Sequence, residues 1–295
     1  MKPLLAGPAS VSAEDAYAQC ERLTKTHYEN FTVVSWLLPR TVRKHFHAVY
    51  AYCRHVDDLG DEASGDRLVL LDEWEADLRR CYEGTPRHPF LIALQQTIRA
   101  HDIPIEPFLS LIEANRIDQG SGRFETYADL LHYCEHSATP VGRLVLYLLG
   151  HRDAKRQQLS DATCMALQLA NFWQDVARDA AAGRIYIPLE DMTTFGYTEE
   201  ELLHHVVNDN LRSLMAFEVD RAKTLFHEGL ALVALVKGRG KLDIALFSVG
   251  GLSILKAIER QGYDVFSSRP TVSSRSKLAL MAVTVAKLLA RRRLV

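Results

Sequence analysis

Paired cysteines, a basic excess and clear strand patterns are all missing from this 295-residue sequence. The five cysteines are scattered and none forms a Cys-x-x-Cys pair, which argues against structural zinc or a disulfide framework and favours a reducing compartment. With 35 basic and 37 acidic residues the formal net charge is −2, which gives no support to nucleic-acid binding. We therefore expect a cytoplasmic globular protein without a nucleic-acid partner.

Long hydrophobic runs are missing as well. The longest apolar stretches, 144–150 and 278–289, fall short of the roughly 18–20 residues that a membrane span needs. The second stretch contains Lys287 and is followed by Arg291, Arg292 and Arg293. A basic, apolar helix end can rest on an anionic membrane surface, although a last core helix with a cationic end is the interpretation we favour. Peripheral contact with the inner membrane surface stays open.

Helical periodicity is abundant. Strand-like alternation is confined to Arg184–Ile187, which stops at Pro188 and has no obvious partner. No repeat of fixed period and no linker rich in proline, glycine or serine divides the chain. We predict an all-α fold in which residues 1–295 form a single domain of roughly ten helices. Apolar residues recur at three- and four-residue steps over Val42–Asp61, Val69–Tyr82, Phe90–Ala100, Phe108–Ile117, Tyr127–Leu149, Ala162–Asp179, Leu211–Val236, Leu242–Ile258 and Lys277–Leu289.

A first acidic cluster lies at the end of one predicted helix. Asp57 and Asp61 are four residues apart and share a helix face, with Asp58 beside them. Like charges at this spacing destabilise a bare helix, and a divalent cation would relieve the repulsion. Arg54, one turn earlier, would add a charge-assisted hydrogen bond to a bound diphosphate. A solvated acidic helix end is the plainer explanation of this cluster taken alone.

A second cluster makes metal binding a better explanation than a solvated helix end. Asn171, Asp175 and Asp179 follow one another at four-residue steps in an otherwise apolar helix. A solvated polar stripe is the alternative here, but two such clusters on two apolar helices are harder to explain in this way. Their separation of 118 residues lets the two helices face each other across a bundle, where such sites are built.

The donor types indicate the metal. All candidate ligands are oxygens, which suits several Mg²⁺ ions whose coordination shells are completed by water and substrate phosphate. Such ions would stabilise a diphosphate leaving group. The sequence carries no P-loop, no dinucleotide-binding glycine pattern and no Gly-x-Ser-x-Gly, and the Glu201–His204 element lacks the partner that a di-iron bundle needs.

These clusters resemble those of the squalene/phytoene synthase family. The resemblance spans about residues 18–280 and includes His27–Phe31, Tyr133–Cys134, Ser137–Gly142 and Gly183–Pro188. It implies a class I isoprenoid (terpenoid) synthase bundle around a central cavity, Mg²⁺-dependent binding of a prenyl diphosphate, and no NADPH. By this resemblance the metal ligands are Asp57, Asp61, Asn171, Asp175 and Asp179, the catalytic residues are the four aspartates of that set with Tyr50 and Tyr186, and the substrate-binding residues are His27, Asn30, Phe31, Arg54, Asp58, Ser137, Val141, Gly142, Gln168, Asn171 and Arg184.

Within the family the phrases Glu29–Arg40, His136–Pro140 and Gly262–Phe266 are most similar to bacterial hydroxysqualene synthases of hopanoid biosynthesis. That similarity implies conversion of presqualene diphosphate and water to hydroxysqualene and diphosphate, with other squalene-pathway enzymes as potential partners. Three departures from the condensing members agree with it: Gln174 replaces their usual Arg, Arg178 their usual Glu, and Gly251 a frequent Tyr.

Two alternatives remain. One is condensation of two farnesyl or geranylgeranyl diphosphates to presqualene diphosphate, squalene or phytoene, and the other is a non-catalytic helical scaffold. Tyr50, Asn30 and Tyr186 could each hold the attacking water, and the sequence does not choose among them. Removal of Asp57 or Asp175 is expected to abolish turnover and leave the fold intact, because it relieves repulsion between carboxylates.

Overall fold

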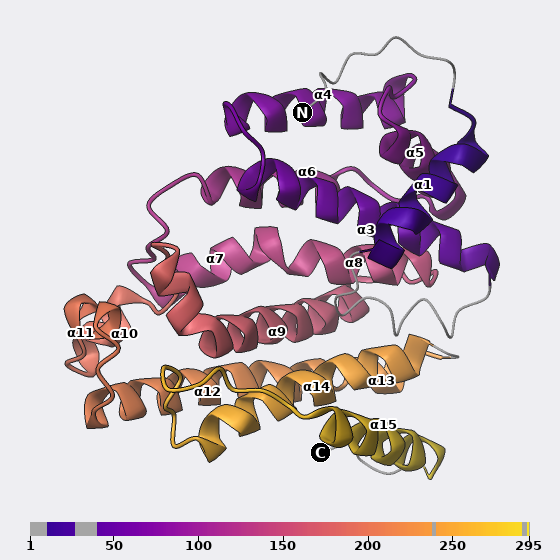
Figure 1. Ribbon diagram of the computed structural model, residues 1–295. Coiled ribbons are helices and arrows are strands. Elements are labelled where there is room, and N and C mark those ends of the chain that lie inside the picture. Colours follow the sequence, from indigo (N-terminus) through magenta and orange to yellow (C-terminus); the bar gives the residue numbers. More distant parts are fainter. Residues whose placement is uncertain (1–10, 27–39, 238–239, 291–293, 295) are drawn as a thin grey trace.

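The computed structural model describes residues 11–26, 40–237, 240–290 and 294. These residues form helices and connecting loops without a named strand, which confirms the all-α prediction (Figure 1). The helices are α1 (Ala13–Thr26), α3 (Arg40–Asp61), α4 (Arg67–Glu83), α5 (Pro89–His101), α6 (Glu106–Ile117), α7 (Tyr127–Ser137), α8 (Thr139–Leu148), α9 (Ala154–Ala181), α10 (Leu189–Thr194), α11 (Glu199–Leu203), α12 (Asp209–Gly229), α13 (Leu232–Leu235), α14 (Gly240–Arg260) and α15 (Ser274–Leu289).

Two expected helices are interrupted. The predicted 127–149 helix breaks at Ala138, because Pro140 has no N–H to donate and is accepted only in the first turn of α8. The predicted 211–236 helix ends at Gly229 and continues as the short α13. The predicted 162–179 helix begins earlier, at Ala154, where the Asp153 side chain accepts a hydrogen bond from the Arg156 N–H.

The strand-like stretch Arg184–Ile187 forms no strand. It makes a single isolated parallel bridge between Ile185 and Arg123, in which the Ile185 N–H donates to the Gly122 carbonyl. This bridge fixes the course of the chain after α9 and holds the following residues against the loop before α7.

The long helix α9 lies at the centre of the bundle. It contacts α8 on one side and α12 and α14 on the other, and Figure 1 shows the helices stacked from α4 at the top to α15 at the bottom. The core has two large parts. One, rich in α9 and α12 residues, contains Trp173 and Phe226; the other, centred on α3 to α6, contains Tyr52 and Phe108.

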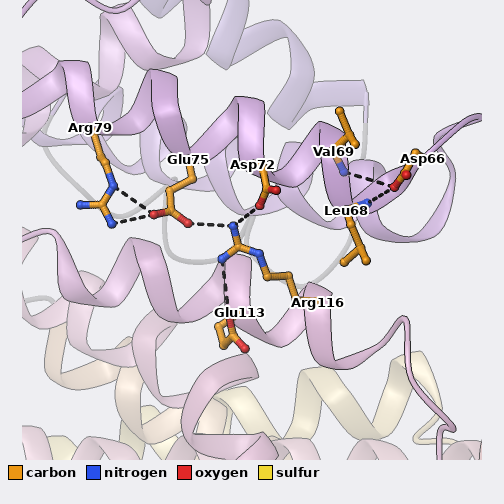
Figure 2. Close-up of polar contacts among 8 residues, drawn as sticks. All are labelled: Asp66, Leu68, Val69, Asp72, Glu75, Arg79, Glu113 and Arg116. Carbon is orange, nitrogen blue, oxygen red and sulfur yellow. Dashed lines mark hydrogen bonds and ion pairs between the residues drawn. The ribbon is translucent and has the colours of Figure 1, made fainter.

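An ion-pair network fastens α6 to α4. Arg116 on α6 donates to Asp72 at 2.6 Å and to Glu75 at 2.8 Å, both on α4, and lies 3.4 Å from Glu113 (Figure 2). Glu75 also accepts from Arg79 on its own helix (Figure 2). The residue next to Arg116 is Asn115, so the network also fixes the depth at which Asn115 enters the bundle.

Within the described ranges, no helix combines the length and the apolar character that crossing a membrane requires.

Candidate active site

The first aspartate cluster occupies the last two turns of α3. The Asp57 carboxylate is reached by solvent but is surrounded by protein atoms, and this desolvation, together with the nearby charge of Asp61, raises its pKa to about 6. Arg54 is already engaged, since it pairs with Asp58 at 2.7 Å and with Glu62 at 2.8 Å. Asp61, more than half exposed, lies at the rim of the cluster.

The second cluster lies near the end of α9. Asn171 is exposed, whereas Asp175 and Asp179 are partly buried. Burial raises the pKa of Asp179 to about 6, with the charge of Asp175 acting in the same direction and Arg184 opposing it. The polar stripe expected from the four-residue spacing therefore exists, on a helix whose neighbouring residues Phe172 and Trp173 are core.

Arg184 lies near one aspartate of each cluster. Its guanidinium lies 3.3 Å from the Asp61 carboxylate at the end of α3, and its backbone N–H donates to the Asp179 carbonyl at the end of α9. Partial burial lowers the pKa of Arg184, but the nearby acidic groups of Tyr186, Asp61, Asp179 and Asp118 outweigh it and raise that pKa. That the two clusters together form one metal site stays a prediction.

Asn115 supports the first cluster from behind. Its side-chain amide donates to the Leu111 carbonyl at 3.0 Å and approaches the Asp57 carboxylate at 3.4 Å. Gly60 makes this approach feasible, because a Cβ at position 60 would lie 2.0 Å from the Asn115 Oδ1 atom. Gln119 closes the arrangement by donating to the carbonyls of Gly60 and Asn115. Gly60 weakens the end of α3, but a larger residue at this position would leave no room for the Asn115 side chain.

An aromatic group lies beside the charges. Tyr186 stacks on Phe172 with ring centroids 3.8 Å apart and planes within 7°, and its ring is 6.0 Å from that of Tyr133. The Tyr133 hydroxyl donates to Asp118 at 2.9 Å, while burial raises the Asp118 pKa to about 6. A small hollow of about 10 Å³, the room of one water molecule, is lined by residues that include Phe172, Asp179, Arg184 and Tyr186.

A segment near the C-terminus reaches across the second cluster. Arg269 binds Asp175 through two nearly parallel hydrogen bonds of 2.6 and 2.7 Å, and donates to the Gln174 side chain at 2.9 Å. Gln174, almost fully buried, in turn donates to the Pro270 carbonyl. Arg178 is largely exposed and lies 3.4 Å from Asp175. Removal of Asp175 would therefore break an ion pair with Arg269 as well as relieve its repulsion of Asp179, a loss that the sequence did not predict.

The other predicted residues differ in their surroundings. Gly142 lets α8 approach α9 closely, because a Cβ there would lie 2.4 Å from the Ser160 hydroxyl and 2.5 Å from the Cys164 sulfur. Val141 packs against the α3 to α6 part of the core. Tyr50 and Gln168 are half-buried on α3 and α9, and Ser137 ends α7. His27, Asn30 and Phe31 lie outside the described residues.

The donors suit Mg²⁺. The predicted ligands offer carboxylate and amide oxygens alone, and burial raises the pKa values of Asp57 and Asp179 to about 6, so a nearby cation would stabilise their ionised forms. Across the ranges that the structure covers, no three His, Cys, Asp or Glu side chains are close enough to hold an ion without other ligands. The assignment of Asp57, Asp61, Asn171, Asp175 and Asp179 as ligands stays a prediction.

Sequence reasoning missed Asn115, Asp118, Tyr133 and Arg269 as site residues. Tyr133 stood in a phrase shared with the family but was not selected for a role. The other three had no sequence signal, because they contact the site across separations such as 58 residues for Asn115 to Asp57 and 94 for Arg269 to Asp175.

Comparison with known proteins adds independent information. A family model described as squalene/phytoene synthase matches residues 24–276. A phytoene synthase of Arthrospira platensis is 34% identical, with 98% of this chain and 97% of that protein covered, and a 15-cis-phytoene synthase of Synechococcus elongatus is 30% identical over 97% of each.

Two solved structures are also similar. One, described as squalene synthase HpnC from Alicyclobacillus acidocaldarius, is 50% identical with a TM-score of 0.83, covering 85% of this chain and 96% of that one. A ligand complex of a dehydrosqualene synthase is 28% identical with a TM-score of 0.85, covering 94% of this chain and 98% of that one.

Proposed function

Because the chain belongs to the squalene/phytoene synthase family, we propose that it converts presqualene diphosphate and water to hydroxysqualene and diphosphate, a carbon–oxygen lyase step of hopanoid biosynthesis. Family membership supports an enzyme acting on a prenyl diphosphate over a helical scaffold without activity. The finer choice of reaction rests on the site.

Gln174 is the observation that carries the choice. It occupies the place of an arginine in the condensing members that the sequence resembles, and here it is buried between Pro270 and Arg269. Gly251 is another departure from the condensing members. A Cβ atom added at position 251 would lie 2.1 Å from the Phe226 ring, so a larger side chain has no room there. Gln174 and Arg178 together place the positive charge one helical turn later than in the condensing members, on an exposed Arg178 that lies 3.4 Å from Asp175, so the charge around the second cluster is arranged differently from theirs.

The reaction begins with diphosphate departure. The C–O bond breaks with its electron pair going to the diphosphate, and several Mg²⁺ ions held by Asp57, Asp61, Asn171, Asp175 and Asp179 would supply charge stabilisation to that leaving group. Arg184, positioned between the clusters, donates hydrogen bonds to the same charge, and Arg54 lies one turn away from Asp57.

The cyclopropylcarbinyl cation then rearranges and is captured. The stacked rings of Tyr186 and Phe172 present aromatic faces that stabilise positive charge. A water oxygen bonds to the cationic carbon and loses a proton to the released diphosphate. Tyr186, which lines the hollow beside Arg184, is our choice among the three candidates to hold that water. No reductant takes part, so no NADPH is needed.

Condensation of two farnesyl or geranylgeranyl diphosphates is the second candidate, favoured by the similar phytoene synthases. Purified protein with Mg²⁺ is therefore given farnesyl, geranylgeranyl and presqualene diphosphate in separate reactions, and products are identified by mass spectrometry. The proposal predicts an alcohol from presqualene diphosphate alone. Any C30 product from farnesyl diphosphate would contradict it.

A paired variant tests the role of the departures. Gln174→Arg with Arg178→Glu restores the residues of the condensing members, and a gain of product from farnesyl diphosphate would tie these positions to reaction choice. An unchanged substrate range in a folded variant would show that Gln174 does not determine it.

We also propose that the protein contacts the inner membrane surface peripherally, because the proposed substrate and product are strongly hydrophobic. Other squalene-pathway enzymes are proposed as partners on the same ground.

A further inference from the structure

The outward side of α15 is apolar. Leu278, Val283 and Leu289 are 66%, 52% and 80% exposed. The small residues Ala279, Ala282 and Ala286 between them are exposed as well. At 100° per residue, these six positions fall on the side of the helix opposite Thr284, the one buried residue of α15. A helix that is apolar on both sides normally lies inside a protein or against another apolar phase.

Among the residues that the structure describes, packing contacts reach one side of α15. The helix lies at the lower edge of the bundle and packs against α14 (Figure 1). Leu288 contacts a small core cluster that includes Leu146 and Ile244. The packing expected of a last core helix is therefore present on one face of α15. The opposite face has no partner among the described residues.

The charge around this face has one sign. Residues 265–295 contain seven basic and no acidic side chains, although the whole chain has a net charge of −2. Arg275 and Lys277 are exposed in the first turn of α15, Lys287 lies in its last turn, and Arg291–Arg293 follow in the sequence. A second copy of this chain would bring the same positive charges together, whereas an anionic lipid surface would neutralise them.

We propose that the outward face of α15 is a docking surface for an anionic phospholipid bilayer, with Leu278, Val283 and Leu289 entering the interface and Arg275, Lys277 and Lys287 binding lipid phosphates. The surface is close to the site. Only four residue steps separate Arg269, bound to Asp175, from the α15 N-cap Ser273, a reach of at most about 14 Å. Docking would therefore bring the second aspartate cluster near the membrane, where a prenyl diphosphate resides.

The inference is independent of the reaction, so its test uses vesicle binding rather than turnover. Full-length protein is mixed with phosphatidylcholine vesicles with and without about one third phosphatidylglycerol, and the bound fraction is measured by flotation. We expect binding to the anionic vesicles, weakened by salt, and about tenfold weaker binding of a Leu278→Ser/Leu289→Ser variant. An inactive Asp57→Asn protein should bind as the wild type does.

A matched control is available on α4, where Leu68 and Val69 are 47% and 50% exposed. Leu68→Ser/Val69→Ser should leave vesicle binding unchanged. The inference is overturned if wild-type protein does not float with anionic vesicles, or if the two double variants bind equally. It is also overturned if sedimentation shows a wild-type dimer that the α15 variant dissociates. A large loss of thermal stability in the α15 variant would show that another part of the chain covers this face, again contradicting the inference.

Discussion

The Asp57 carboxylate in the candidate site lowers the stability of the fold when it is ionised. Its pKa is about 6 in the folded protein and about 3.9 in an unfolded chain, so between these values the native state binds the extra proton more tightly. Stability from this group is therefore greatest in acid and is lost as the pH rises through 6. Because solvent reaches the side chain, we take the cost of the ionised form as about 1 kcal/mol.

We predict that Asp57→Asn unfolds at a higher temperature than the wild type near pH 7.5 without metal, and that the difference disappears near pH 4. Turnover should fall about a hundredfold or more, because a metal and diphosphate contact is lost. Thermal unfolding across pH, with the exposed Glu73→Gln as control, measures the first effect. Near-wild-type turnover would contradict the metal assignment, and a pH-independent stability gain would contradict the raised pKa.

Asp175 should behave differently from Asp57. Its carboxylate is bound by Arg269 at 2.6 and 2.7 Å, so Asp175→Ala removes two hydrogen bonds that hold the segment around Arg269 against α9. We expect loss of turnover with no gain in stability at any pH. A stabilised Asp175→Ala protein would show that this ion pair is absent in solution.

Asn115 is a positioning residue whose importance shows in metal affinity. Its amide is the donor that faces Asp57, and removal of such outer contacts typically weakens metal binding 10–100-fold. We predict that Asn115→Ala raises the Mg²⁺ concentration for half-maximal turnover about tenfold. The control is Asn210→Ala, which loses a side-chain hydrogen bond to the Gly196 carbonyl on another surface. An unchanged Mg²⁺ requirement would exclude this role.

At the scale of the element, α14 contains two adjacent glycines in opposite surroundings. A Cβ at Gly250 would meet nothing within 4 Å, whereas a Cβ at Gly251 would lie 2.1 Å from the Phe226 ring of α12. We predict that Gly250→Ala stabilises the protein by about 0.5–1 kcal/mol, through the better helix propensity of alanine. Gly251→Ala should destabilise it, because an aromatic core side chain must move.

Urea unfolding of the two variants provides the comparison. Equal effects at the two positions would show that α14 does not pack on α12 as described. Since Gly251 is also one of the departures from the condensing members, the same pair of variants shows whether a larger residue at 251 is tolerated without change at Phe226.

At the scale of the whole molecule, the fold could be predicted because apolar residues that recur at three- and four-residue steps indicate helices. The aspartates of α3 and α9 could be assigned to common faces for the same reason. The break at Ala138 was missed because the apolar pattern runs through Pro140 undisturbed. Asn115 and Arg269 were missed because tertiary packing brings them to the site, as when the Arg116 network sets the depth of α6.

The arrangement as a whole supports one chemical claim: a single prenyl diphosphate is ionised between the two aspartate clusters and its cation is captured by water. The most direct test is turnover of presqualene diphosphate with Mg²⁺ in ¹⁸O-labelled water, with the product analysed by mass spectrometry. We predict an alcohol that carries one ¹⁸O atom per molecule. An unlabelled alcohol, or a hydrocarbon in its place, would contradict capture by water.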